Sequence, residues 1–476
     1  MNCIIFSGII TLAFGGLLVP IVGNLFKLSR EWILNLFLLV FLIAGGLFLY
    51  GFGHGHIIYP NLFTTDTVSL LMTIFVWFTG AVVLITIFNT LKEINNLAEI
   101  LGVYAISLSG AILTLYANNF VSFLVAMELM TIPSYYLIMA RLNTITTEAA
   151  TKYFFNGALS TGFFLFGILV FYAITGDLQF SAINKAFQAE DSFGILFFVF
   201  GFIAILSAIG FKMSFAPYHF YAPDTYTGAP ASVAAYLAGI TKSAVAIPVI
   251  RLFFEALSFQ KEDWSILLAL LAVVTMTIGN LLALAQQSVA RILAYSSIAH
   301  AGYILVGFAA AVSGLAITGI VYQAVAYILM KAGAFLMVTL LIYYYGIKTR
   351  EQLRGFGKIN PFMALVFTIL LLSLAGVPPT AGFIAKVYLF QAAVDAGMAW
   401  LAFIGLLNSA FAVAYYLWII KEMYLEAPQR LEKPKDTSFL IPTMAIGMLA
   451  FLTIVFGIWV TPVVKASLAF TQLFPF

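Results

Sequence analysis

Charged residues are what this sequence lacks most. Only 9% of its 476 residues are Asp, Glu, Lys or Arg, against about 25% in an ordinary soluble domain, while 63% are hydrophobic. This balance excludes a soluble fold. Apolar stretches of about 20 residues, the length at which an α-helix crosses the hydrocarbon core of a bilayer, recur from one end of the chain to the other. The sequence therefore predicts an all-α polytopic membrane protein.

Cysteine and cofactor motifs are almost as scarce. The single cysteine, Cys3, excludes a disulfide framework and an iron–sulfur cluster held by this chain alone. The sequence also has no glycine-rich phosphate or dinucleotide loop and no cluster of metal ligands. We therefore expect this chain to bind no cofactor and no metal, and to have no nucleic-acid partner.

The apolar stretches predict about 14 transmembrane helices. The seventh carries Pro217 at its end and the twelfth is interrupted between Gly376 and Gly382, so both are expected to be broken helices. The expected spans are 3–26, 32–52, 67–90, 97–117, 119–140, 149–175, 194–216, 230–257, 264–285, 290–312, 314–346, 361–390, 397–425 and 439–463.

Lysine and arginine in the loops and near the span ends are distributed unequally between the two sides of the membrane. Because cytoplasmic loops are enriched in basic residues, the richer side is expected to be cytoplasmic and both termini non-cytoplasmic. The richer side has thirteen: Lys27, Arg30, Lys92, Arg141, Arg291, Lys348, Arg350, Arg354, Lys358, Lys421, Arg430, Lys433 and Lys435. The other side has four: Lys185, Arg251, Lys261 and Lys465.

Five further lysines fall inside the predicted spans: Lys152, Lys212, Lys242, Lys331 and Lys386. Each costs about 2.5–3.5 kcal/mol near the bilayer centre on insertion scales, so such residues persist where they have partners or a role. Glu128 is the only acid clearly inside a span. A nonpolar environment favours the neutral form of an amine and a nearby carboxylate favours the charged form, so a movable carboxylate could load and unload protons.

Plainer interpretations remain open for each residue. A lysine at a span end can extend its ammonium to the lipid headgroups, and this alternative weighs more for Lys152 and Lys331 than for the other three lysines. Glu128 could make a structural interhelical hydrogen bond. His300 could relay protons near neutral pH or simply pack in the interior.

The spacing of these features predicts an internal repeat. Lys152, Lys212 and the seventh-span break are followed five spans later by Lys331, Lys386 and the twelfth-span break. Because five is odd, the two units would cross the membrane in opposite senses, as two inverted five-helix repeats. The expected divisions are helices 1–3 (1–96), the first repeat of helices 4–8 (97–257), the second repeat of helices 9–13 (258–425), and a C-terminal loop with helix 14 (426–476).

Three motifs resemble the antiporter-like membrane subunits of complex I-type dehydrogenases. They are Phe211 to Pro230 (FKMSFAPYHFYAPDTYTGAP), Ser296 to Tyr303 (SSIAHAGY) and Leu374 to Phe383 (LAGVPPTAGF). The segments from Glu128 to Tyr136 and from Glu148 to Phe154 look closest to the branch called subunit N. A lysine rather than a glutamate in span 12 also favours that branch. The resemblance covers nearly the whole chain.

The resemblance implies both a proton path and an assembly. The matching path residues are Glu128, Lys152, Lys212, Lys242, His300, Lys331 and Lys386. The implied complex oxidises a soluble donor such as NADH, reduced deazaflavin coenzyme or ferredoxin, and reduces a quinone-like carrier in a prokaryotic-type cell membrane. Flavin, iron–sulfur clusters and quinone would belong to the peripheral and other membrane subunits of that complex.

Two functions therefore compete, and a third is weaker. The first is a redox-coupled proton-pumping subunit, and the second is a subunit of a multisubunit cation/proton antiporter with the same fold. A proton-inactive scaffold is the weakest, because five lysines inside spans would then have no role.

Overall fold

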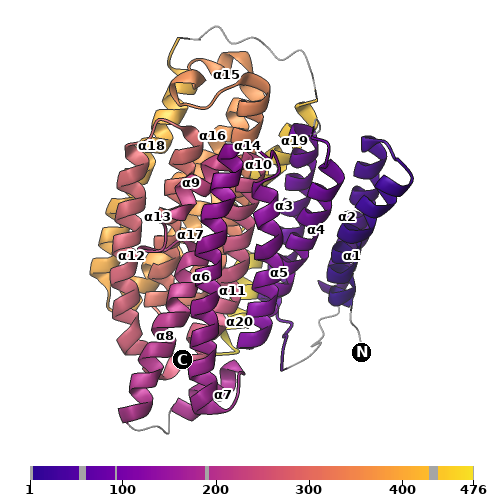
Figure 1. Ribbon diagram of the computed structural model, residues 1–476. Helices are drawn as coiled ribbons and strands as arrows, with labels where there is room; N and C mark the ends of the chain where they lie inside the picture. The colour runs from indigo at the N-terminus through magenta and orange to yellow at the C-terminus, as the bar shows by residue number, and fades with distance from the viewer. Residues whose placement is uncertain (1–3, 53–60, 92–93, 188–191, 428–437, 475–476) are drawn as a thin grey trace.

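The computed structural model describes residues 4–52, 61–91, 94–187, 192–427 and 438–474. Within these ranges the chain forms a bundle of helices, and its only β-pairing is three isolated bridges. Thirteen of the helical segments are long and apolar enough to cross a membrane. The first helix begins at the end of the bundle where the last helix lies (Figure 1). These observations confirm the prediction of an all-α polytopic membrane protein.

Helices of the first half follow the expected spans within a few residues. Asn119 and Asn143 cap the N-termini of α5 and α6, where each side chain accepts a hydrogen bond from the backbone N–H three residues on. The bounds are α1 (Ile4–Leu25), α2 (Arg30–Phe52), α3 (Thr67–Thr90), α4 (Leu97–Thr114), α5 (Phe120–Ile138), α6 (Thr144–Thr175), α7 (Phe180–Phe187), α8 (Ser192–Met213), α9 (Tyr221–Gly228), α10 (Ala231–Ala235), η1 (Tyr236–Thr241), α11 (Lys242–Arg251) and η2 (Leu252–Ala256).

In the second half, the fourteenth span is shorter than expected. Helix α19 ends at Ile458, and Pro462 lies in the first turn of a separate helix, α20, where proline is tolerated. The bounds are η3 (Ser258–Gln260), α12 (Lys261–Leu284), α13 (Val289–Ala309), α14 (Leu315–Tyr345), η4 (Glu351–Leu353), α15 (Phe356–Ile359), α16 (Pro361–Ala375), α17 (Ala381–Asp395), α18 (Ala399–Tyr424), α19 (Leu440–Ile458) and α20 (Thr461–Thr471).

Both predicted helix breaks are present. Helix α8 ends at Met213, Ser214 adopts a positive φ of 60°, and the short helix α9 follows. The twelfth span consists of α16 and α17, each of 15 residues and therefore about 22 Å long, too short to cross about 30 Å alone. Together with the thirteen candidate spans, this pair completes the expected fourteen.

Helix α14 is the central element of the bundle. Every residue from Ala316 to Leu341 is buried, and the helix packs against α3, α10, η1, α11, α13, α16, α17, α19 and α20 (Figure 1). It carries Lys331 and brings the eighth, tenth and twelfth membrane segments, with Lys242, His300 and Lys386, around one common axis.

Large apolar side chains cover the outside of the bundle. Phe155 and Leu169 on α6 and Leu42 on α2 are each more than 60% exposed. In water, so extensive an apolar surface would favour aggregation, whereas in lipid it is the expected exterior. The chain is an integral, multi-pass membrane protein.

Candidate functional site

A largely buried ion pair joins the fifth and seventh membrane segments. Nζ of Lys212, in the last turn of α8, lies 3.5 Å from Oε1 of Glu128 on α5. The same Nζ donates a 2.7 Å hydrogen bond to Oγ1 of Thr131, and Thr161 on α6 donates a 2.8 Å bond to Oε1 of Glu128. Because only 3% of the Lys212 side chain is exposed, its charged form depends on these neighbours rather than on solvent.

The break after α8 leaves backbone groups that need partners inside the membrane. The Tyr221 hydroxyl donates a 2.9 Å hydrogen bond to the Phe211 carbonyl, which also accepts a 3.1 Å bond from the Ser214 N–H. The Ala216 N–H donates to Oγ1 of Thr275, 3.1 Å away. These side chains stabilise a break directly beside Lys212.

Lys242 lies at the next interruption of regular helix. It is the first residue of α11 and follows the π-helical turn η1, a type of irregularity that is frequent at functional sites. Its Nζ donates a 2.8 Å hydrogen bond to Ser297 on α13 and lies 5.5 Å from the centre of the Tyr226 ring. The Ser297 hydroxyl is in turn 2.5 Å from the Tyr327 hydroxyl of α14.

Lys331 and His300 both lie next to Tyr327. Nζ of Lys331 donates to Oγ of Ser296, 2.6 Å away, and lies 5.8 Å from the centre of the Tyr327 ring. The His300 ring centre is 5.5 Å from that of Tyr327, and its Nδ1 is 3.1 Å from the Gln323 amide nitrogen. His300 Nε2 and Gln323 Oε1 are buried and have no hydrogen-bond partner among the described residues, so internal water is expected at both atoms.

Lys386 completes this series on α17. Its Nζ donates two 2.8 Å hydrogen bonds, one to the Ala375 carbonyl at the end of α16 and one to Ser409 on α18. It also lies 4.9 Å from the centre of the Tyr303 ring, and Tyr303 contacts His300. Lys386 therefore lies beside the break in the twelfth span, as Lys212 lies beside the break in the seventh.

The other three buried lysines differ from Lys212 in the charges around them. Within the part of the chain that the structure describes, no carboxylate forms an ion pair with Lys242, Lys331 or Lys386; their partners are hydroxyls, carbonyls and aromatic rings. Hydroxyl and carbonyl acceptors carry no net charge, so they favour the protonated form of the amine less strongly than a buried carboxylate does. These amines are therefore suited to exchanging a proton.

The structure separates Lys152 from the other lysines. Its side chain is 43% exposed, and its Nζ lies 2.8 Å from Glu148 and 2.9 Å from Asp224 of α9. Arg291, at the start of α13, lies 3.4 Å from the other Asp224 oxygen. Lys152 therefore belongs to a partly exposed ion-pair network that ties α6 to α9 and α13, and not to the buried series.

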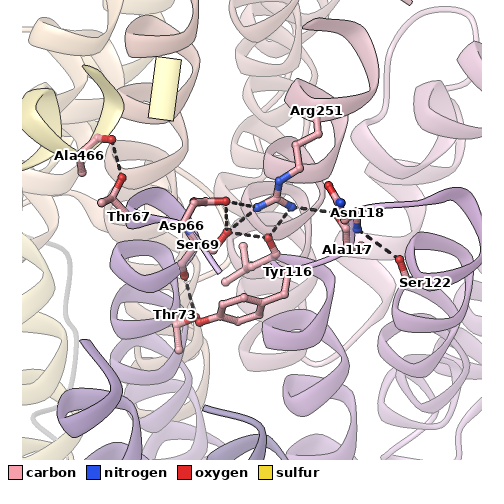
Figure 2. Close-up of polar contacts among 11 residues, drawn as sticks. Asp66, Thr67, Ser69, Thr73, Tyr116, Ala117, Asn118, Ser122, Arg251 and Ala466 are labelled. Carbon is pink, nitrogen blue, oxygen red and sulfur yellow. Dashed lines mark hydrogen bonds and ion pairs between the residues drawn. The ribbon is translucent and has the colours of Figure 1, made fainter. Parts of the chain in front are cut away.

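Sequence reasoning missed a second buried ion pair, and it assigned Arg251 to the exposed basic residues. In the structure Arg251 is 2% exposed and lies 2.5 Å from Asp66, the residue that caps α3 (Figure 2). The guanidinium also donates to Ser69 and to the carbonyls of Leu115 and Ala117. Arg251 inside the predicted eighth span and an acid directly before the third were the available signals.

The buried residues form a row of titratable groups from α8 to α17. Tyrosines lie between them: Tyr221 and Tyr226 between Lys212 and Lys242, and Tyr327 and Tyr303 between Lys242 and Lys386. Among the described residues no group of three His, Cys, Asp or Glu side chains is arranged to hold a metal ion. The arrangement has the chemistry of a proton path.

Comparison with known proteins gives the family. The model of the NADH:quinone oxidoreductase/Mrp antiporter transmembrane family matches residues 117–412. NADH-quinone oxidoreductase subunit N of Trichlorobacter lovleyi is 39% identical over 74% of this chain and 73% of its own length. F(420)H(2) dehydrogenase subunit N of Methanosarcina mazei is 33% identical over 90% of this chain and 88% of its own.

A solved structure agrees with this assignment. A chain of respiratory complex I from Thermus thermophilus superimposes with a TM-score of 0.80 at 27% identity, covering 97% of this chain and 99% of that one. The resemblance noted in the sequence motifs is therefore confirmed. With more than half of its length matched by the family model and most of it aligned to subunit N proteins, the chain belongs to the NADH:quinone oxidoreductase/Mrp antiporter family of transmembrane subunits.

Proposed function

We propose that this chain is a subunit N-like, proton-translocating membrane-arm subunit of a complex I-type respiratory dehydrogenase. One observation carries the proposal: four lysines and a histidine are buried in a row across the bundle, and one carboxylate, Glu128, is paired with the first of them. Groups of this kind inside a membrane mark ion or proton pathways.

The first step depends on the distance between Glu128 and Lys212. At 3.5 Å the carboxylate favours the protonated amine. When Glu128 is neutralised or drawn toward Thr161, Lys212 loses that stabilisation and releases its proton to the interior. The accepting group is Lys242, with water and the intervening tyrosine hydroxyls as carriers.

Further transfer follows the hydroxyl contacts around α14. Lys242 and Tyr327 share Ser297, Lys331 contacts Ser296, and His300 lies between Tyr327 and Tyr303. Lys386 receives the proton beside the twelfth-span break, where the interrupted backbone provides polar groups for water. In this proposal Lys152 also belongs to the path, as a charged group where the path is partly exposed.

The redox chemistry lies in partner subunits. The relatives are named as subunits of NADH-quinone oxidoreductase and of F(420)H(2) dehydrogenase, so the donor of the present complex is NADH or a reduced deazaflavin, with ferredoxin as a further candidate. Flavin, iron–sulfur clusters and the quinone-like acceptor would be bound by the peripheral and other membrane subunits. This chain takes part in the oxidoreductase reaction as a translocase subunit.

The proposal includes an orientation and a division into units. With the side richer in lysine and arginine taken as cytoplasmic, the α14–α16 connection, with Lys348, Arg354 and Lys358, faces the cytoplasm of a prokaryotic-type cell. Both termini are then non-cytoplasmic. Residues 97–257 and 258–425 act as inverted repeats, each with one broken helix, after the N-terminal helices of 1–96 and before the C-terminal 426–476.

A cation/proton antiporter subunit is the alternative, because the family that contains this chain includes Mrp antiporters. Purification of the complex in mild detergent distinguishes the two functions. Dehydrogenase and iron–sulfur proteins that remain bound support the redox-coupled pump, whereas a set of small membrane subunits without redox centres supports the antiporter.

A further inference from the structure

A cavity of about 260 Å³ opens at the end of the bundle that carries most of the basic residues. It lies where the start of α6, the α9–α10 turn, the start of α13 and the end of α14 meet. Arg141, Ile145 and Lys348 are among its outer residues, and Tyr226 is among its lining residues although only 2% of Tyr226 is exposed. The cavity therefore extends from the surface to a buried tyrosine.

Tyr226 stands between the cavity and two of the buried lysines. The centre of its ring is 5.5 Å from Nζ of Lys242. Its ring also meets that of Tyr221 edge to face, with centres 6.4 Å apart, and the Tyr221 hydroxyl bonds to the carbonyl of Phe211, next to Lys212. Tyr226 is thus the lining residue that connects the cavity to the buried lysines.

Two unpartnered hydroxyls lie one residue away in the sequence from Tyr226 and Lys242. Oγ1 of Thr225 and Oγ of Ser243, the sequence neighbours of Tyr226 and Lys242, are buried and have no hydrogen-bond partner among the described residues. Leaving a buried hydroxyl unsatisfied costs about 1–3 kcal/mol, so water is expected to bind here.

We infer that Tyr226 is the relay residue through which protons pass from this cavity to Lys242. The inference rests on the proposed function and names its intake. The Tyr226 hydroxyl gives its proton, through one water molecule, to the neutral Lys242 amine and takes a proton from water in the cavity. The two transfers are coupled, so no charge remains on the phenol oxygen.

The ring and the hydroxyl of Tyr226 have separable effects. The ring face stabilises the Lys242 ammonium as a cation–π partner, which phenylalanine would do as well. Only the hydroxyl can carry a proton. Tyr226→Phe therefore removes the relay and leaves packing and the cation–π contact in place.

The test is the rate of proton translocation by the whole complex in reconstituted vesicles, at equal abundance of complex. Tyr226→Phe should slow pumping about tenfold, less than the roughly 10²-fold that a positioned proton donor contributes, because water partly replaces the hydroxyl. Tyr104→Phe is the matched control: Tyr104 is fully buried, donates to the Gly80 carbonyl and does not line the cavity, so loss of its hydroxyl should leave pumping unchanged. Parental pumping by Tyr226→Phe overturns the inference.

A second measurement tests the cavity itself. Ile145→Cys, introduced together with Cys3→Ser, places a thiol at the cavity mouth, and a bulky membrane-impermeant maleimide should then slow pumping when it is applied from the cytoplasmic side. The same reagent should leave the Cys3→Ser parent unaffected. Unchanged pumping after complete labelling contradicts an intake through this cavity. Lys242→Ala, measured in parallel, distinguishes failure of the intake from failure of the proposed function. If Lys242→Ala also pumps normally, the proposed function itself is wrong.

Discussion

Lys212 and Glu128 come from different helices and meet at 3.5 Å between Nζ and Oε1, with hydroxyls of Thr131 and Thr161 on either side. The carboxylate thus has two competing partners, an amine and a hydroxyl. Because a neighbouring carboxylate favours the charged amine, movement of Glu128 between them changes the proton affinity of Lys212.

Proton translocation should therefore tolerate a shorter acidic side chain at position 128 better than a neutral one. We expect Glu128→Asp to retain more proton translocation than Glu128→Gln, because aspartate keeps the negative charge although it lies farther from Lys212. Donor oxidation and proton uptake, measured on the same vesicle preparations, give the comparison. Equal activity of the two variants would show that Glu128 serves as a hydrogen-bond partner only.

Variants at Lys386 distinguish proton transport through the whole bundle from a path confined to the first repeat. Lys386→Ala should slow pumping substantially. Lys386→Arg should also fail, because a guanidinium keeps its proton at physiological pH. Its larger head must also fit beside Gly376, where even a single added Cβ atom would lie 3.0 Å from the Lys386 amine. Full activity of the arginine variant would mean that position 386 needs only a positive charge. Assembly is checked on native gels.

The membrane helices and the buried lysines could be predicted from the sequence. Charged residues are costly in lipid, so long apolar runs, and the few lysines inside them, are easily recognised. Burial of individual residues could not. Arg251 and Lys152 both lie inside apolar runs, yet Arg251 is buried against Asp66 and Lys152 is half exposed. The difference depends on which helix face meets a neighbour, and Asp66 and Asp224 reach their partners from other segments of the chain.

The Arg251–Asp66 pair should contribute to stability rather than to transport. Arg251→Ala would leave the Asp66 carboxylate buried without its partner, a change that costs about 3–5 kcal/mol. We expect a lower temperature of subunit release from the purified complex. Lys421→Ala, which removes a largely exposed partner of Glu426, should leave that temperature unchanged.

A double variant sharpens this prediction. Arg251→Met with Asp66→Leu removes both charges, so it should be less destabilised than Arg251→Ala alone. If the double variant were the less stable of the two, the network drawn in Figure 2 would contribute through packing and its carbonyl contacts rather than through the paired charges.

Gly239 allows the turn η1 to approach α14 beside Lys242. A Cβ atom at position 239 would lie 2.8 Å from Cβ and 2.9 Å from the backbone nitrogen of Ala332, the residue after Lys331. Gly239→Ala should therefore push the two helices apart, at about 1–3 kcal/mol, and slow pumping by displacing Lys242 from Ser297. Gly46→Ala on α2, where the new Cβ meets no atom within 4 Å, is the control and should be neutral. Normal pumping by Gly239→Ala would show that this contact does not position Lys242.

The central claim is that buried amines of this chain carry protons, and Lys212→Ala tests it most directly. The measurement is the number of protons translocated per donor oxidised in vesicles that contain the purified complex, with the amount of assembled complex matched to the parent. Removal of Lys212 deletes a titratable group and leaves the helix break and its hydrogen bonds in place. We expect the ratio to fall while the complex still assembles. An unchanged ratio in Lys212→Ala would contradict the account.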